Sequence, residues 1–155
     1  MTDTYETDFF AWTQAQAAAL RATRPNNIDW ANIAEELETM GRSERREVEN
    51  RIRLILTHLL QWRYQSWMRT PSWRHTLRVQ RRDLEKVLRE SPSLRPSIPD
   101  AVRDEYEAAL RDAYFETGLR HGALPENCPF SPDQVLDPDY LPDAVTGTGV
   151  SPGAT

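Results

Sequence analysis

Arginine side chains are the groups in this chain best placed to do chemistry. At about 100° per residue, four of them fall on one sector of a helix predicted over residues 73–90: Arg74, Arg78, Arg81 and Arg82. A guanidinium presents a planar fork of donors that matches the oxygens of a phosphate or a carboxylate. The sector is therefore a candidate surface for an anion or for an acidic partner.

The positive charge of these four arginines can be met by acidic residues of the same chain, by an external anion or by water. Glu85 lies at helical spacing from Arg81, Arg82 and Arg89 and is expected to pair with one of them. The remaining charge meets the acidic helices of the same chain, an external anion or water. Pairing within the molecule is favoured over an acidic protein partner. Nucleic acid ranks last, because its binding domains are usually clearly basic and this chain carries a net charge of −5.

Carboxylates are densest at Glu35, Glu36 and Glu38. A carboxyl group that works in acid–base catalysis has to be held in a cleft, and only Glu36 lies at the edge of the apolar stripe of its predicted helix. Structural ion pairs explain such a cluster without catalysis. We therefore interpret these three glutamates and Glu85 as ion-pair residues, and we identify no catalytic residue.

The sequence predicts no metal site and no cofactor. None of His58, His75 and His121 has an acidic residue three or four positions before it, and Cys128 has no histidine or second cysteine at ligand spacing. The chain also lacks a Gly-x-Ser-x-Gly nucleophile motif and a glycine-rich phosphate loop. An enzyme is therefore only the third hypothesis for this chain.

Charge changes sign twice along the chain. Residues 1–41 carry a net −5, residues 42–90 a net +7, and residues 91–155 a net −7. A basic middle between acidic ends can neutralise itself on folding or present a basic face to an anion.

The chain has no predicted membrane segment and no predicted export signal. Its longest apolar runs contain four residues, whereas a membrane span needs about 18. Its first residues are acidic, where a secretory signal is basic. A single cysteine fits a reducing compartment, so we expect a cytoplasmic protein that does not contact a membrane.

Periodic apolar residues predict an all-α protein. Thr7, Asp29 and Ser72 are the expected N-caps, and Gly118 is expected to end the last long helix. The predicted long helices cover residues 8–21, 29–41, 43–65, 73–90 and 99–117.

The strongest of these helices is the one over residues 43–65. Its apolar stripe continues to Trp62, and Trp73 opens the stripe of the next helix, so both tryptophans are expected in the core. Gly41 and Ser43 separate this helix from the one before it, and the pattern leaves open whether the two are continuous.

The chain after Gly118 is rich in proline and has no long period. Ser131 followed by Pro132 predicts one short helical turn, and scattered apolar residues predict an arm that docks on the helices. We therefore expect a single-domain bundle of four to six helices over residues 1–142, with this arm starting at about residue 118. Residues 143–155 are expected to be disordered.

Five stretches carry a family resemblance: YETDFFAWTQAQAAALRA, DWANIAEELETMGRSERREVENRIRLILTHLLQWRYQ, SWRHTLRVQRRDLEKVL, SPSLRP and CPFSPDQVLDPDYLP. In this order they resemble the bacterial family called domain of unknown function 29, from about Tyr5 to Pro142. The resemblance implies an all-helical domain. It implies no activity and supplies no catalytic or binding residues.

These observations favour a non-enzymatic interaction module. The arginine sector and the arm would hold a protein partner or a second copy of the chain. The alternative is a nucleic-acid-binding protein that uses the same arginines.

Overall fold

A computed structural model describes residues 4–23 and 29–145 of the chain. The first predicted helix break falls mostly on residues 24–28, and the predicted disordered tail falls mostly on residues 146–155. Both of these segments lie outside the described residues.

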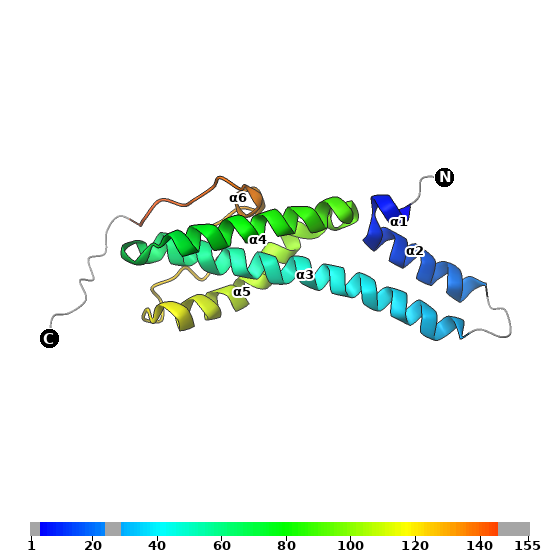
Figure 1. The fold of residues 1–155 in the computed structure, drawn as a ribbon. Helices are drawn as coiled ribbons and strands as arrows, with labels where there is room; N and C mark the ends of the chain where they lie inside the picture. Colours follow the sequence, from blue (N-terminus) through cyan, green and yellow to red (C-terminus); the bar gives the residue numbers. More distant parts are fainter. Residues whose placement is uncertain (1–3, 24–28, 146–155) are drawn as a thin grey trace.

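The described residues contain helices and no strand, which confirms the all-α prediction (Figure 1). Two short 3-10 helices, η1 and η2, flank α4. The elements in chain order are α1 Thr4–Thr7, α2 Phe9–Ala22, α3 Trp30–Tyr64, η1 Ser66–Met68, α4 Pro71–Glu90, η2 Pro92–Ser97, α5 Ile98–Thr117 and α6 Pro132–Leu136.

Helix α3 is continuous over 35 residues and is the central helix, against which α2, α4 and α5 pack. This answers the question that the sequence left open, because Gly41 and Ser43 lie inside one helix. Helix α2 packs beside the N-terminal half of α3, whereas α4 and α5 pack beside its C-terminal half (Figure 1). The hydrogen bond from Phe10 N to Ser91 Oγ, at 3.1 Å, joins the start of α2 to the end of α4.

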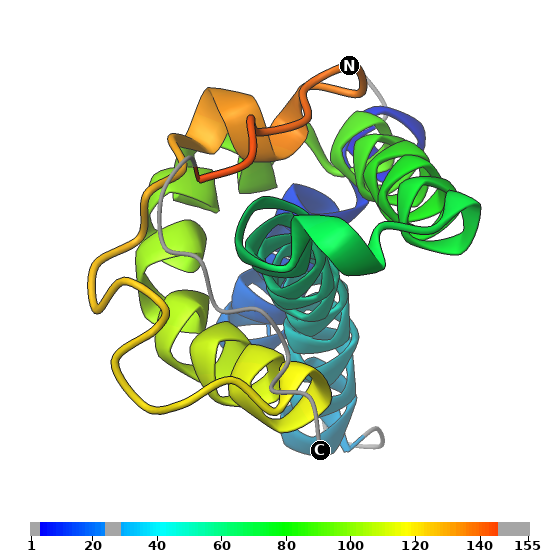
Figure 2. The same cartoon turned by 90° about the vertical axis from the view of Figure 1, so that its left-hand side faces the viewer.

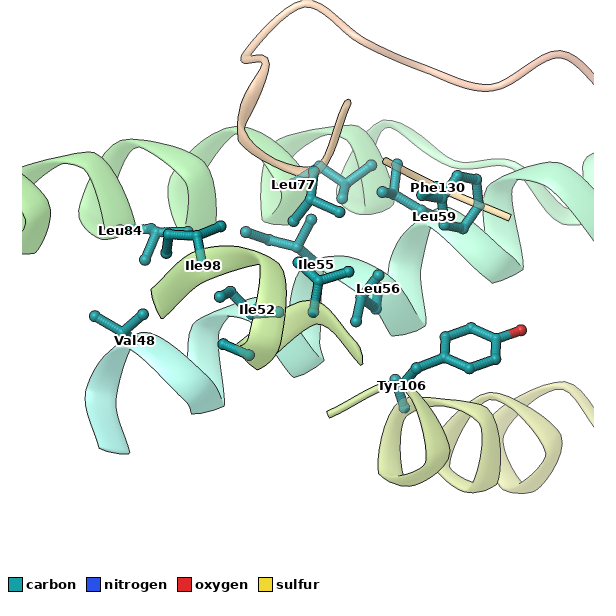
Figure 3. Close-up of a cluster of buried hydrophobic side chains, with 14 of the residues drawn as sticks. Val48, Ile52, Ile55, Leu56, Leu59, Leu77, Leu84, Ile98, Tyr106 and Phe130 are labelled. Carbon is teal, nitrogen blue, oxygen red and sulfur yellow. The ribbon is translucent and has the colours of Figure 1, made fainter. Parts of the chain in front are cut away.

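The core lies where α3, α4 and α5 meet (Figure 3). Helix α3 contributes the largest share of it, with a buried stripe at three- and four-residue spacing as predicted. The chain after α5 adds Leu124, Phe130 and Val135 to the same cluster. Representative buried residues of the helices are Val48, Ile52, Ile55, Leu56, Leu59, Leu77, Leu84, Ile98 and Tyr106.

The C-terminal arm, residues 119–142, turns back over the helices after α5. Figure 2 shows it leaving the end of α5, passing along the outer side of that helix and crossing toward α4, where α6 lies. Helix α6 contacts α3, α4 and α5. Tyr114 Oη accepts hydrogen bonds from Gly122 N at 2.9 Å and from Leu124 N at 3.0 Å, which fixes the first turn of the arm.

Two predicted N-caps were wrong, because a nearby residue accepts the hydrogen bond from the free backbone N–H of the first turn instead. Asp8, rather than Thr7, caps α2, since its Oδ1 accepts from Ala11 N at 2.9 Å. Thr70, rather than Ser72, caps α4 and accepts from Trp73 N at 3.3 Å, with proline at the first helical position.

Three other helix ends follow the local signals. Asp29 caps α3 by accepting from Asn32 N at 3.2 Å. Gly118 ends α5 in the left-handed conformation, with φ 66°. Ser131 and Gln134 form a capping box at the start of α6.

The predicted apolar faces differ from the observed ones in two places. Ile33 and Met40 fall at helical spacing on the apolar stripe predicted for residues 29–41, yet they are 40% and 45% exposed. The reason is that α2 packs against the side of α3 that carries Ala34 and Gly41. Trp62 and Trp73 were expected in the core and are only half-buried. None of the helices in the described ranges is long and apolar enough to cross a membrane.

Candidate functional site

A groove of about 860 Å³ lies between the first half of α4, the end of α3 and the C-terminal arm. Pockets of about 300–1,000 Å³ typically hold small ligands, so the groove is large enough for one or for a few residues of a peptide. Its lining is basic on the side of α4. The lining residues are Trp62, Arg69, Thr70, Pro71, Arg74, His75, Leu77, Arg78, Arg81, Pro138, Asp139 and Leu141.

Arg81 ties α4 to the C-terminal arm. Its guanidinium donates to the backbone oxygens of Val135 at 2.9 Å, Gln134 at 2.9 Å and Tyr140 at 2.8 Å. The first two carbonyls belong to the last turn of α6, where helix carbonyls lack partners within the helix. Arg81 is only 3% exposed, and this burial lowers its pKa although Asp137 acts in the opposite direction.

The prediction that Arg81 faces outward with the other three arginines was therefore wrong. Within the described part of the chain, its side chain donates only to backbone carbonyls of the arm. Arg81 therefore holds the arm in place as one wall of the groove, and it contributes little free charge to the surface of the groove.

Arg69 closes the end of the groove near η1. Its Nε donates to Trp62 O at 2.9 Å, and its guanidinium lies over the Trp62 ring, 4.6 Å from the centroid. A second nitrogen of Arg69 lies 3.5 Å from Pro142 O. The cation–π contact between Arg69 and Trp62 holds this half-buried tryptophan in the lining of the groove.

Arg74 and Arg78 are the free cations of the groove. Both are exposed, both line it, and neither side chain forms an ion pair or a hydrogen bond with any residue that the structure describes. They lie four residues apart on α4, so their side chains leave the same side of the helix one turn apart. Arg82 lies outside the groove and pairs with its neighbour Asp83 at 3.1 Å.

Among the residues that the structure describes, the groove has one acidic lining residue, Asp139, which lies on the arm opposite α4. Its two walls therefore differ in charge. A ligand that presents acidic groups to α4 would meet Arg74 and Arg78, while the arm presents a carboxylate and apolar residues.

Comparison with known proteins shows the family. The sequence pattern of the family described as domain of unknown function DUF29 matches residues 4–141. The chain belongs to this family. All of the groove-lining residues of this DUF29 protein lie within the matched range.

One solved structure extends the comparison. It is the crystal structure of an alpha-helical protein of unknown function from Rhodospirillum rubrum, at 28% identity and a TM-score of 0.70. The similarity covers 90% of the DUF29 chain and 93% of the other chain. No curated protein matches the chain.

The glutamates that the sequence singled out lie away from the DUF29 groove. Arg21 of α2 forms an ion pair with Glu38 and so joins α2 to α3, whereas the pair of Arg42 with Glu35, at 3.0 Å, lies within α3. Glu36 is exposed and has no ion pair among the described residues.

Glu85 forms a different ion pair from the ones expected. Its partner is Arg95 in η2, rather than Arg81, Arg82 or Arg89. The reason is that Arg81 is bonded to the arm, Arg82 lies beside Asp83, and η2 folds back next to the end of α4.

Histidine and cysteine side chains do not gather in this DUF29 protein. His58 bonds the carbonyl of Leu54 at 2.9 Å, and burial raises the pKa of the half-buried Cys128 thiol. Across residues 4–23 and 29–145, no group of three or more histidine, cysteine or acidic residues is arranged to hold a metal ion.

Sequence reasoning missed the second wall of the groove. Trp62 was assigned to the core, and neither Arg69 nor Asp139 was singled out. The arm has no periodic pattern, so no local signal placed it beside the first half of α4. About 60 residues of chain separate Arg78 from Asp139, well beyond the reach of any periodic pattern.

Proposed function

We propose that this DUF29 protein is a non-enzymatic interaction module whose groove binds an acidic segment of a partner protein. The observation that carries the proposal is the pair Arg74 and Arg78, which line the groove and have no ionic partner among the described residues. Half-buried Trp62 beside them adds an apolar surface. Buried aromatic residues and arginines are the side chains that dominate binding energy at protein interfaces.

Charge favours an acidic protein segment over nucleic acid. The free cations are few, and Asp139 lies across the groove from them. A nucleic-acid surface normally extends as a basic stripe on a basic domain, whereas this chain carries a net charge of −5. The acidic segment could belong to another protein or to a second copy of the chain.

We also propose that the chain from its first helix to residue 142 folds as one domain that includes the arm. Support comes from Phe130 and Val135, which are buried in the same cluster as the core residues of α3 and α4. The groove would then be a permanent feature of the domain, because one of its walls is the arm itself.

The experiment is a fluorescence anisotropy titration with a labelled glutamate-rich peptide and a labelled DNA duplex of equal net charge. We expect the peptide to bind and the duplex to bind far more weakly. The double variant Arg74→Glu/Arg78→Glu should lose peptide binding, while the matched single variant Arg82→Glu should keep it, since Arg82 lies outside the groove.

Two outcomes would overturn the proposal. Duplex binding without peptide binding, with a loss of roughly 0.9 log unit of affinity per log unit of salt for each phosphate contacted, would support the nucleic-acid alternative. Unchanged peptide binding by the double variant would remove the groove from consideration. Analytical ultracentrifugation of the free protein distinguishes a second copy as the partner, because the double variant would then shift dimer to monomer.

A further inference from the structure

We infer that the groove accepts its partner as an extended strand with acidic side chains at alternating positions, and not as a helix. This inference rests on the proposed function and specifies the conformation and the sequence pattern of the bound segment. Three features of the groove support it: the spacing of Arg74 and Arg78, the closeness of the arm to α4 at Arg81, and the backbone of the arm.

The spacing of the two free arginines fits alternate residues of a strand. Four residues of helix rise about 6 Å along the axis, at 1.5 Å per residue, and this separates Arg74 from Arg78 on α4. In an extended chain, residues i and i+2 lie on the same side and are about 6.6 Å apart. Two acidic residues separated by one residue therefore meet both arginines at once.

A helix could also present acids at about this spacing, so the arginines alone do not separate a strand from a helix. Near Arg81 the arm lies one arginine side chain away from α4, because that side chain bonds directly to Val135 O and Tyr140 O. A helix with its side chains is about 10–12 Å across. A strand pairs at only about 4.8 Å from its neighbour, so an extended segment can lie closer to the arm than a helix can.

The arm also offers backbone groups to a strand. In the described part of the chain, Leu141 N and Leu141 O have no hydrogen-bond partner, although Leu141 lines the groove. The neighbouring carbonyls of Tyr140 and Pro142 are already used, by Arg81 and by Arg69. An extended segment can pair its main chain with such unused groups, as in strand addition.

The test uses short labelled peptides of equal length and equal net charge, each with two glutamates at a different spacing. One peptide has them at i and i+2 in a chain of β-branched residues and serines, one has them at i and i+1 in the same background, and one has them at i and i+4 in an alanine-rich helix. We expect the alternating peptide to bind about 10-fold more tightly than each of the others, which corresponds to about 1.4 kcal/mol.

A charge exchange then assigns the contacts. Arg78→Glu should weaken the alternating peptide about 10-fold, and replacing one of its glutamates by lysine should restore binding to that variant. Arg74→Glu should be restored by lysine at the other glutamate, so the two rescues also give the direction of the bound chain. The control Arg82→Glu should be rescued by neither, because it should lose nothing. Circular dichroism of each variant confirms that the helices are intact.

The outcomes separate this inference from the proposed function. If the helical peptide binds best, or if all spacings bind equally and require Arg74 and Arg78, the groove binds acidic segments but the strand assignment is wrong. If no peptide binds, the proposed function itself fails. Rescue by lysine at either position for both variants would also contradict a fixed strand.

Discussion

Arg81 of α4 and Val135 of α6 form the bond that attaches the C-terminal arm to the helices, with Arg81 Nε 2.9 Å from Val135 O. The same guanidinium bonds two more backbone carbonyls. One buried side chain thus donates hydrogen bonds to free carbonyls at the end of α6 and holds the arm as one wall of the candidate groove. Because a buried charge is costly unless it is fully bonded, the arm and Arg81 depend on each other.

Replacing Arg81 should destabilise the protein through these carbonyls. Arg81→Lys keeps the charge but can reach fewer of the three oxygens, so we expect the free energy of unfolding to fall by about 2 kcal/mol. Arg81→Ala should cost about 3 kcal/mol. Urea unfolding followed by circular dichroism measures both. Arg82→Ala, at an exposed position on the same helix, should change stability by less than about 0.5 kcal/mol.

Local signals in the sequence predicted most of the helical structure. Asp29, Gly118 and the Ser131–Gln134 pair act within one turn of their own helices, so their caps could be assigned without knowledge of the fold. The buried stripe of α3 was predictable for the same reason, since its period shows directly which face is apolar.

Features that depend on contacts between distant segments could not be predicted. Gly41 looked like a helix break because glycine costs about 1 kcal/mol in a helix, yet it is kept there by the close approach of α2. Arg74, Arg78 and Arg81 share one sector, and only the path of the arm decides that Arg81 is buried while the other two stay free. That path follows proline-rich chain without a period.

The N-cap of α4 can be tested directly. Thr70→Ala removes the oxygen that accepts from Trp73 N, so we expect a loss of about 1 kcal/mol in the free energy of unfolding. Ser72→Ala is the matched control, because Ser72 lies inside the first turn and its side chain makes no hydrogen bond with the described residues. A larger loss for Ser72→Ala than for Thr70→Ala in thermal melts would contradict the cap assignment.

Glu44 gives a prediction for pH. Burial raises the pKa of this carboxyl, and the charges of Glu47 and Glu90 raise it further. The folded protein therefore binds the proton more tightly than the unfolded chain does. The resulting stabilisation is complete below the unfolded pKa of about 4.3 and is lost as pH rises through the raised pKa of the folded state.

Glu44→Gln should accordingly raise the melting temperature at neutral pH by about 1–3 °C, a small effect because the side chain is partly exposed to solvent. The difference from the wild type should disappear at about pH 4, where the glutamate is protonated as well. Differential scanning calorimetry at the two pH values measures this. Glu36→Gln, at an exposed position on the same helix, is the control for loss of a negative charge.

Gly41→Ala tests the contact between α2 and α3. A Cβ at this position would lie 2.6 Å from Thr13 Oγ1 and 2.7 Å from Gln14 Nε2, well inside the contact distance of about 3.5 Å. Gln14 is exposed and can move away, but Thr13 is fully buried and its hydroxyl donates to Phe10 O at 2.8 Å. The overlap should outweigh the better helix propensity of alanine, for a net loss of about 1 kcal/mol.

The double variant Thr13→Ala/Gly41→Ala removes the atom that causes this overlap. In a double-mutant cycle measured by urea unfolding, we expect a coupling of about 1 kcal/mol that favours the double variant over the sum of the single changes. If Gly41→Ala alone is more stable than the wild type, α2 does not approach α3 this closely. Gly41 would then only lower the helix propensity of α3.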